Sequence, residues 1–391
     1  MTKANAIDYI SVISLIVFHA IGLFYPQLNQ VFLYGISPFL FVIFFFRKWS
    51  LYTSSSYYYL CIFYLWMFIC TIAAYDMGTA LADIKRVLGI VIVGFIIINL
   101  SQKKELIPWL YLVFIGKFIA LLYYMQTNVL SVIDYRTERA SDEYVNANTY
   151  AYFAFYTTIA IYVLGIIIEG KWRKIIRILF LTMIPLSFFI AIITASRQVI
   201  IIQVPTIFFL IVSRYRIYKL SRLLLSIVIA IGVSLFFYEQ TSEIYSNSYL
   251  YQRAQENVKD DTRTVLIKEA IRVGIEHPFF GAGPSCFPYL NRHTEAGHMS
   301  HCSYTDVFAE CGVLGLVIFL FVIITFIKDQ WKIYMQTKDE LIFCFLIFGI
   351  MFGFYNFLFV FYRNLWLMAM FIVVAQHSLI YYQEKYLETQ D

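Results

Sequence analysis

Side chains that could do acid–base chemistry gather in a polar segment, about residues 239–306, which interrupts an otherwise apolar chain. His298 and His301 stand three residues apart and precede Asp306 and Glu310, which are spaced to share one helical face. Histidine titrates near neutral pH and carboxylates accept protons, so His301, Asp306 and Glu310 are candidate general bases. Two alternatives stay open. The histidines could ligate a metal, although no third ligand has a fitting spacing, or the acids could only cap and solvate a helix.

Arginines form the second candidate chemistry, because a guanidinium fork suits phosphate groups. Arg197 lies in a tight turn between two apolar runs, where a cation is costly unless it faces a cavity or an anion. The alternative is an arginine that only snorkels to the membrane surface. Arg263 opens the segment 264–275, whose pattern predicts an amphipathic helix on the outer surface, and a solvated charge is the alternative there.

Smaller groups complete the set of candidate side chains. Arg136 and Arg139 precede Asn148, which stands where another apolar run begins. Gly281 and Gly283 flank one alanine and predict a tight turn with a close backbone approach. This Gly-x-Gly is not the phosphate loop of a nucleotide-binding protein, because it has neither the following lysine nor a preceding strand.

Membrane-spanning helices must position these groups. The chain is 61% hydrophobic and 14% charged, whereas a soluble protein carries roughly a quarter charged residues. Apolar runs without period-2 alternation predict helices and exclude a barrel. The sequence therefore predicts an all-α, polytopic bundle of about twelve transmembrane helices that forms a single membrane domain over 1–391. The predicted spans are 6–25, 29–46, 57–75, 86–100, 106–125, 147–168, 178–195, 198–212, 223–238, 307–327, 341–361 and 365–383.

Basic residues predict the orientation of the bundle. Lysine and arginine are concentrated in one alternate set of connections, which the positive-inside rule assigns to the cytoplasm. Both termini are then cytoplasmic, and the large loop 239–306 with its short amphipathic helices is extracytoplasmic. Lys3 precedes a first span that lacks a cleavage site, so this span reads as a retained anchor. The net charge of +5 is a topology signal and does not argue for nucleic-acid binding. Cys286 and Cys302 share the external loop, where a disulfide between them is one alternative.

The order of these groups from about 136 to 316 resembles the O-antigen polymerase/ligase family of bacterial membrane glycosyltransferases. In one respect the chain departs from the family pattern, because Cys302 stands where the family has an asparagine after its histidine. The matching stretches are Arg139 with Asn148, Thr194-Ala-Ser-Arg197-Gln198, Arg263 followed by His277-Pro-Phe-Phe-Gly281-Ala-Gly283, and His301 followed by Glu310-Cys-Gly312-Val-Leu-Gly315.

The resemblance implies an enzyme of the bacterial inner membrane that needs neither metal nor cofactor. Its donor would be an oligosaccharide on undecaprenyl pyrophosphate in the outer leaflet, with membrane lipid and a chain-length regulator protein as further partners. An acceptor hydroxyl would attack the anomeric carbon, and undecaprenyl pyrophosphate would leave. The expected pyrophosphate ligands are Arg197, Arg263, Arg139 and Arg136, the expected catalytic residues are His301, Glu310 and Asp306, and the other expected substrate contacts are Asn148, Gly281, Gly283 and His298.

Three functions compete at this point. A polymerase would join lipid-linked repeat units into O-antigen, capsular or exopolysaccharide chains, and this is the preferred interpretation. A ligase would pass the finished chain to lipid A–core and would carry the same motifs. A flippase of lipid-linked sugars would be built from two related halves with interrupted helices near the midplane, and the sequence contains no such repeat.

Overall fold

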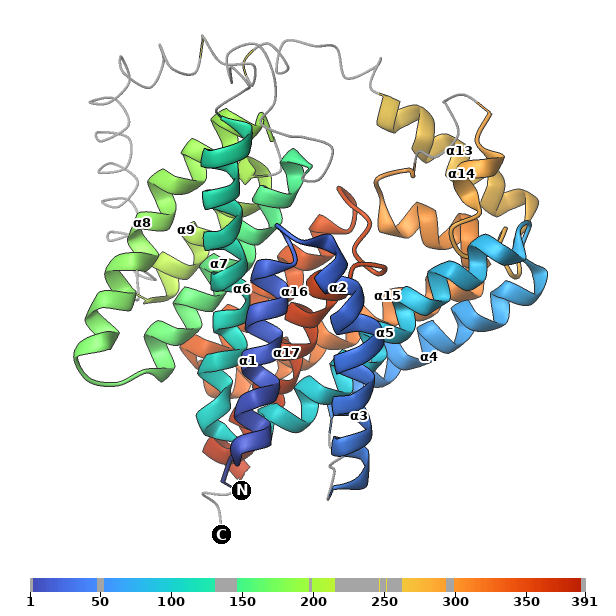
Figure 1. The fold of residues 1–391 in the computed structure, drawn as a ribbon. Helices are drawn as coiled ribbons and strands as arrows, with labels where there is room; N and C mark the ends of the chain where they lie inside the picture. The colour runs from blue at the N-terminus through green and yellow to red at the C-terminus, as the bar shows by residue number, and fades with distance from the viewer. Residues whose placement is uncertain are drawn as a thin grey trace.

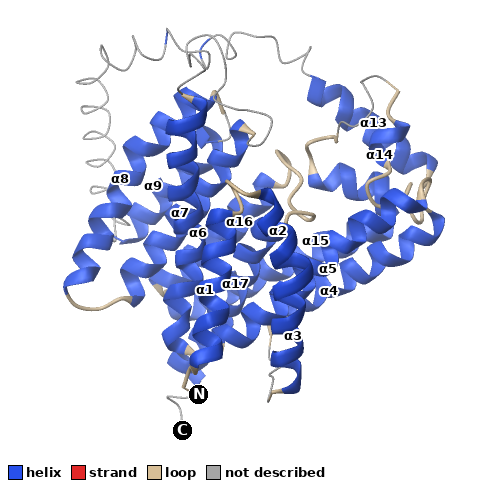
Figure 2. Cartoon of the chain, in the orientation of Figure 1, coloured by secondary structure: helices blue, strands red, loops and turns tan. Residues whose placement is uncertain are grey.

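The fold is known from a computed structural model, which describes residues 3–47, 53–130, 146–196, 199–214, 246, 251, 262–292 and 299–387. Within those ranges all regular secondary structure is helical (Figure 2). The α-helices are α1 (Ala6–Ile21), α2 (Pro26–Val31), α3 (Ser37–Phe46), α4 (Ser55–Cys70), α5 (Met77–Ser101), α6 (Ile107–Tyr124), α7 (Ala147–Ile167), α8 (Lys171–Thr194), α9 (Val204–Arg214), α13 (Thr262–Glu276), α14 (Phe287–Leu290), α15 (Ser303–Thr337), α16 (Glu340–Tyr355) and α17 (Leu365–Tyr382). Short 3-10 or π turns extend several of them: η1 (Phe32–Ile36), η2 (Thr71–Ala73), η3 (Lys104–Leu106), η4 (Met125–Val129), η5 (Val199–Gln203) and η7 (Gln383–Leu387).

The predicted spans agree with the observed helices in position but not in length. Eleven of the twelve coincide with a described helix, and the twelfth, 223–238, lies outside the described residues. In the described part of the chain, seven helical segments are long and apolar enough to cross a membrane, and three other apolar helices are shorter. The expectation of about twelve spans is therefore met only in part. The predicted span 341–361 is too long, because α16 ends at Tyr355 and a non-helical connector, residues 356–364, follows it.

Short polar side chains set where the helices begin. Asn5 and Asp8 form a reciprocal capping box at the start of α1. Asp339 accepts hydrogen bonds from two amides at the start of α16, and Asn364 does the same for α17. Each cap satisfies backbone donors that have no partner within the helix, which matters most where water is scarce.

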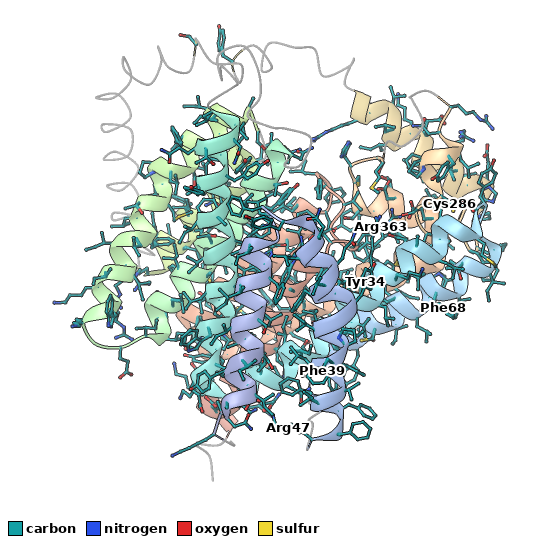
Figure 3. The ribbon with its side chains drawn as sticks, viewed as in Figure 1. Tyr34, Phe39, Arg47, Phe68, Cys286 and Arg363 are labelled. Atoms are coloured by element: carbon teal, nitrogen blue, oxygen red, sulfur yellow. The ribbon has the colours of Figure 1, made fainter. Side chains whose placement is uncertain are left out.

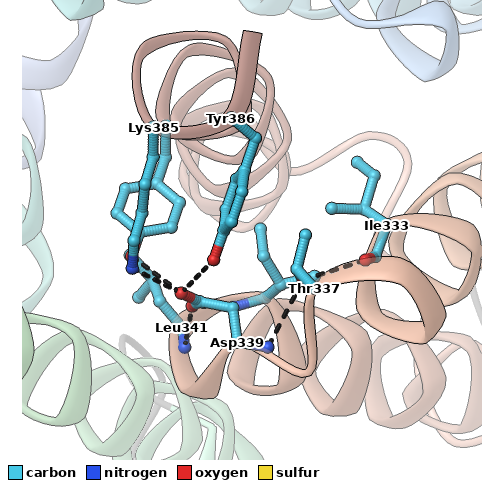
Figure 4. Close-up of polar contacts among 8 residues, drawn as sticks. Ile333, Thr337, Asp339, Leu341, Lys385 and Tyr386 are labelled. Atoms are coloured by element: carbon cyan, nitrogen blue, oxygen red, sulfur yellow. Dashed lines mark hydrogen bonds and ion pairs between the residues drawn. The ribbon is translucent and has the colours of Figure 1, made fainter. Parts of the chain in front are cut away.

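The two ends of the chain lie at the same end of the bundle (Figure 1). The Ala4 amide donates to Glu105, and Lys104 pairs with Glu384 at 3.7 Å. The Asp339 carboxylate accepts from Lys385 at 2.7 Å and from the Tyr386 hydroxyl at 2.8 Å (Figure 4). Basic residues predicted to share the cytoplasmic side therefore do share one end of the bundle.

Buried tyrosines fasten the helices to one another. Six of them donate a hydrogen bond to a backbone carbonyl of another helix or connector, and the bonds are 2.8–3.4 Å long. Inside lipid, such a bond satisfies a hydroxyl that has few other partners. The pairs are Tyr57 with Val91, Tyr64 with Tyr362, Tyr156 with Leu367, Tyr162 with Leu210, Tyr304 with Gly353 and Tyr355 with Ala151.

The predicted amphipathic helix 264–275 is confirmed as α13, but only half of its predicted apolar face is buried. Leu266, Ala270 and Val273 are buried, and α13 packs on α15. Three other apolar residues of the predicted face (Val265, Ile271 and Ile275) are exposed. On the polar side, hydrogen bonding from Arg272 lowers the pKa of Glu276.

Candidate functional site

The framework of the candidate site is a break in α15 at Gly312. Its φ of 69° and ψ of −172° interrupt the helix, so the carbonyls of the preceding turn lose their usual partners. The amide of Ala282 donates to the Ala309 carbonyl at 2.8 Å, and the amide of Gly283 donates to the Glu310 carbonyl at 3.0 Å. The Gly-x-Gly turn therefore replaces the missing helical donors, and two sequence motifs interlock through their backbones.

Both glycines of this turn are required by backbone packing. Gly281 and Gly283 have φ values of +68° and +96°, which side-chain-bearing residues rarely adopt. A Cβ on Gly281 would lie 2.1 Å from the Glu310 carbonyl carbon, and a Cβ on Gly283 would lie 2.3 Å from the Ala74 Cβ. The turn and its close approach agree with the sequence analysis, while contact of these glycines with substrate stays a prediction.

Arg363 joins four segments beside the helix break. Its Nε lies 3.1 Å from Asp83 Oδ2 on α5, and its Nη1 donates to Ser285 Oγ at 2.9 Å. Its Nη2 pairs with Glu310 of α15, which also accepts from the Tyr362 hydroxyl at 3.0 Å. The side chains of Arg363, Asp83 and Glu310 are 6%, 1% and 0% exposed. Such burial is sustainable only because the opposite charges are in contact.

Asp306 lies in the first turn of α15, one turn before Glu310, and His301 lies two residues before this helix begins. The Asp306 carboxylate accepts from the Ser300 amide at 3.0 Å, so it fixes the turn that carries His301. His301 is half-buried and has a φ of 59°, an uncommon left-handed conformation for a histidine. Asp306 is fully buried, and its second oxygen has no hydrogen-bond partner among the described residues. A buried carboxylate oxygen without a partner is costly, and such atoms gather at functional sites.

Cys302 follows His301 at the position where the related family has an asparagine. The Cys302 amide donates to Ser300 Oγ at 3.2 Å, and Cys302 is the N-cap residue of α15. Cys286 and Cys302 are both buried as free thiols, so the disulfide alternative is wrong. Burial raises the pKa of the Cys286 thiol, which holds it protonated and unreactive.

A second polar cluster joins the start of α7 to the end of α8. The Ser196 hydroxyl donates to Asn148 Oδ1 at 3.1 Å, and both side chains are buried. The ring of Tyr152, one turn along α7, packs against Phe359 and Phe361 at 4.8 and 5.7 Å between centroids. The connector 356–364 thus lies between this cluster and the Arg363 cluster. Two of the stretches that carry the family resemblance, at Asn148 and at Ser196, are therefore in contact.

Several predicted site residues cannot be placed in this geometry. Arg136, Arg139, Arg197 and His298 lie outside the described residues. Arg263 is half-buried in the first turn of α13. The described residues contain no group of three or more His, Cys, Asp or Glu side chains arranged to hold a metal.

The sequence analysis assigned no role in the site to four members of the Arg363 cluster: Asp83, Ser285, Tyr362 and Arg363 itself. A signal existed for two of them, since Asp83 and Arg363 are charges within or beside apolar runs. The sequence does not indicate that Asp83 and Arg363 are in contact, because most of the chain lies between them. Ser285 and Tyr362 carry no signal, because polar residues in a loop and aromatic residues beside a span are ordinary.

Comparison with known proteins supports the resemblance in the sequence. No curated protein matches the chain significantly. The family model described as O-antigen ligase matches residues 182–320, a stretch that includes the Ser196 turn, α13, the Gly-x-Gly turn and the break in α15. The motif at Asn148 lies before the matched stretch. Across residues 182–320 the chain is therefore similar to the O-antigen ligase family.

Proposed function

We propose that this protein is a polymerase that joins oligosaccharide repeat units carried on undecaprenyl pyrophosphate into a surface polysaccharide. The observation that carries the proposal is the interlocked site at the break in α15, where the stretch matched by the family model meets the buried ion pair of Glu310 with Arg363. A polar site at one end of an apolar bundle suits a substrate whose lipid lies in the membrane and whose sugars lie in water.

The reaction needs a proton acceptor and stabilisation of a leaving pyrophosphate. A hydroxyl of the acceptor sugar attacks the anomeric carbon of the donor, the bond to undecaprenyl pyrophosphate breaks, and the hydroxyl proton passes to the enzyme. His301 is the proposed base, and Asp306 positions it through the Ser300 turn. Arg197 and Arg263 are the proposed pyrophosphate ligands, because negative charge on the leaving group grows in the transition state.

Glu310 takes a different role in this proposal from the one suggested by the sequence alone. One of its oxygens is held by Arg363 and Tyr362, while the other has no hydrogen-bond partner among the described residues. A carboxylate in contact with a guanidinium is a poor base, because proton uptake would break the ion pair. Glu310 therefore serves to orient Arg363 and the helix break, and His301 is preferred as the base.

A ligase that transfers the finished chain to lipid A–core is the second candidate, because the matched family bears that description. Deletion of the gene followed by gel analysis of the surface glycan separates the candidates. Single repeat units on the surface lipid support the polymerase, and long chains that stay unattached support the ligase. Loss of all surface glycan contradicts both and indicates a flippase.

The site must face outward for this function. Ser248→Cys in the loop 239–306 is expected to react with an impermeant thiol reagent on intact spheroplasts. Lys338→Cys, in the turn between α15 and α16, is the matched control and is expected to react only after lysis. The reverse pattern would contradict the orientation and the proposed mechanism with it.

A further inference from the structure

A cavity of about 240 Å³ lies next to the Arg363 cluster, on the side away from α15. Residues from α2, η1, α5, the connector and the start of α17 line it: Asn29, Phe32, Leu33, Arg86, Arg363, Asn364, Leu365 and Trp366. Figure 3 marks its surroundings with Arg363 in the upper half of the view and Tyr34 below it. Arg363 belongs both to the candidate site and to this cavity, whereas His301 and Asp306 do not line the cavity.

The lining of the cavity favours an anion. Two of its residues are arginines and none is an acid. Arg363 is neutralised by Asp83 and Glu310, whereas exposed Arg86 has no ion pair or hydrogen bond within the described part of the chain. The cavity also lies at the N-terminus of α17, an 18-residue helix whose dipole favours negative charge there. An unpaired guanidinium beside amide side chains has the chemistry of a phosphate site.

Exposed apolar residues next to the cavity favour a ligand with a lipid chain. Leu33 fits against Gly89 of α5, where an added Cβ would lie 3.1 Å from Leu33 Cγ, so η1 and α5 are in contact beneath the cavity. Large apolar residues next to the lining are exposed: Val31 at 52%, Tyr34 at 58% and Leu88 at 55%. In a membrane bundle such exposed residues face acyl or isoprenoid chains. An anionic head in the cavity would therefore have its apolar tail alongside η1 and α5.

We propose that this cavity binds the pyrophosphate of a second lipid-linked saccharide, the acceptor, with Arg86 as the residue that contacts it. The inference rests on the proposed polymerase function, because joining two lipid-linked glycans requires two pyrophosphates to be held at once. The donor occupies the arginines of α13 and the Ser196 turn, and the acceptor occupies the cavity beside α5.

Native mass spectrometry of the purified protein in nanodiscs tests the binding claim without depending on activity. Wild-type protein is expected to bind two molecules of undecaprenyl pyrophosphate, and Arg86→Gln is expected to bind one. Lys85→Gln is the matched control, since Lys85 is an adjacent exposed cation that does not line the cavity. Loss of one charged hydrogen bond should weaken the second binding event about 10- to 100-fold.

A kinetic arm assigns the site to the acceptor. A lipid-linked repeat with a blocked acceptor hydroxyl serves as donor only. A repeat whose anomeric oxygen is replaced by methylene, which makes a C-glycosidic phosphonate that cannot be cleaved at the anomeric carbon, serves as acceptor only. Arg86→Gln should raise KM for the acceptor about 10-fold or more and leave KM for the donor unchanged.

Three results would overturn the inference. They are equal binding by Arg86→Gln and wild type, a single binding event in wild type, and displacement of the second molecule by phosphatidylglycerol at membrane concentrations, which would indicate a structural phospholipid site. Two binding events without any polymer would instead refute the proposed function and leave the cavity as a pyrophosphate site.

Discussion

Replacing Arg363 with glutamine removes the only cation in contact with two buried carboxylates among the described residues. Asp83 and Glu310 are 1% and 0% exposed, so water cannot take over the role of the guanidinium. Removing one partner of a buried ion pair typically costs about 3–5 kcal/mol, because an uncompensated charge remains in a low dielectric. That loss is large against a typical total stability of roughly 5–15 kcal/mol. We therefore expect Arg363→Gln to unfold at a clearly lower temperature than wild type.

The assay is thermal unfolding of purified protein in one detergent at one heating rate, since membrane proteins often unfold irreversibly. Lys104→Gln is the control, because Lys104 is 77% exposed in its pair with Glu384, and loss of such a surface pair should change the midpoint little. The double variant Arg363→Gln/Glu310→Gln should recover part of the loss, since one orphaned charge is removed with the arginine. An Arg363→Gln midpoint no lower than that of Lys104→Gln would refute this account of the cluster.

Three further predictions concern the break in α15 and the proposed chemistry. Gly312→Ala should destabilise the protein by at least about 2 kcal/mol, because φ is +69° and the new Cβ would lie 2.2 Å from a carbonyl oxygen. Gly35→Ala is the control and should be neutral in the same thermal assay, because no atom lies within 4 Å of the added Cβ. Arg197→Ala should abolish polymer in a reconstituted assay while the protein stays folded, and Arg197→Lys should rescue it poorly because a point charge replaces a fork; near-normal polymer from Arg197→Ala would identify a snorkelling residue. His301→Ala should lower turnover at least about 100-fold, and His298→Ala should lower it much less. Activity that is abolished by EDTA and restored by zinc would instead indicate a metal site.

The sequence predicts the helices well because lipid leaves the backbone few choices. An apolar run of sufficient length must satisfy its own amides, so its position follows from composition alone. Helix lengths are less predictable, since α16 ends at Tyr355 although apolar residues continue through Phe361. Contacts with a distant segment hold the connector that follows α16. The Ser303 amide donates to the Asn356 carbonyl, and Ser303 Oγ donates to the Phe359 carbonyl and accepts from the Phe361 amide.

Only those features of the candidate site that depend on residues close together in the sequence were predictable. The Gly-x-Gly turn and the amphipathic α13 follow from neighbouring residues. The break at Gly312 does not, because a glycine in a continuous apolar run is equally compatible with an unbroken helix. The Arg363 cluster depends on contacts between distant segments, and a single sequence contains no signal for which charges will meet.

The tyrosine fastenings have a consequence for the order in which the chain assembles. Tyr64 reaches a carbonyl 298 residues later, and Tyr156 reaches one 211 residues later. During synthesis these hydroxyls enter the membrane long before their acceptor carbonyls exist. Until then the early helices are not fully packed, or their hydroxyls form hydrogen bonds with water and lipid headgroups. Completion of α16 and α17 then supplies the missing carbonyls almost at the end of translation. A chain that lacks its last two helices would therefore keep unsatisfied hydroxyls in its core, and membrane quality control would have a direct means of recognising the unfinished protein.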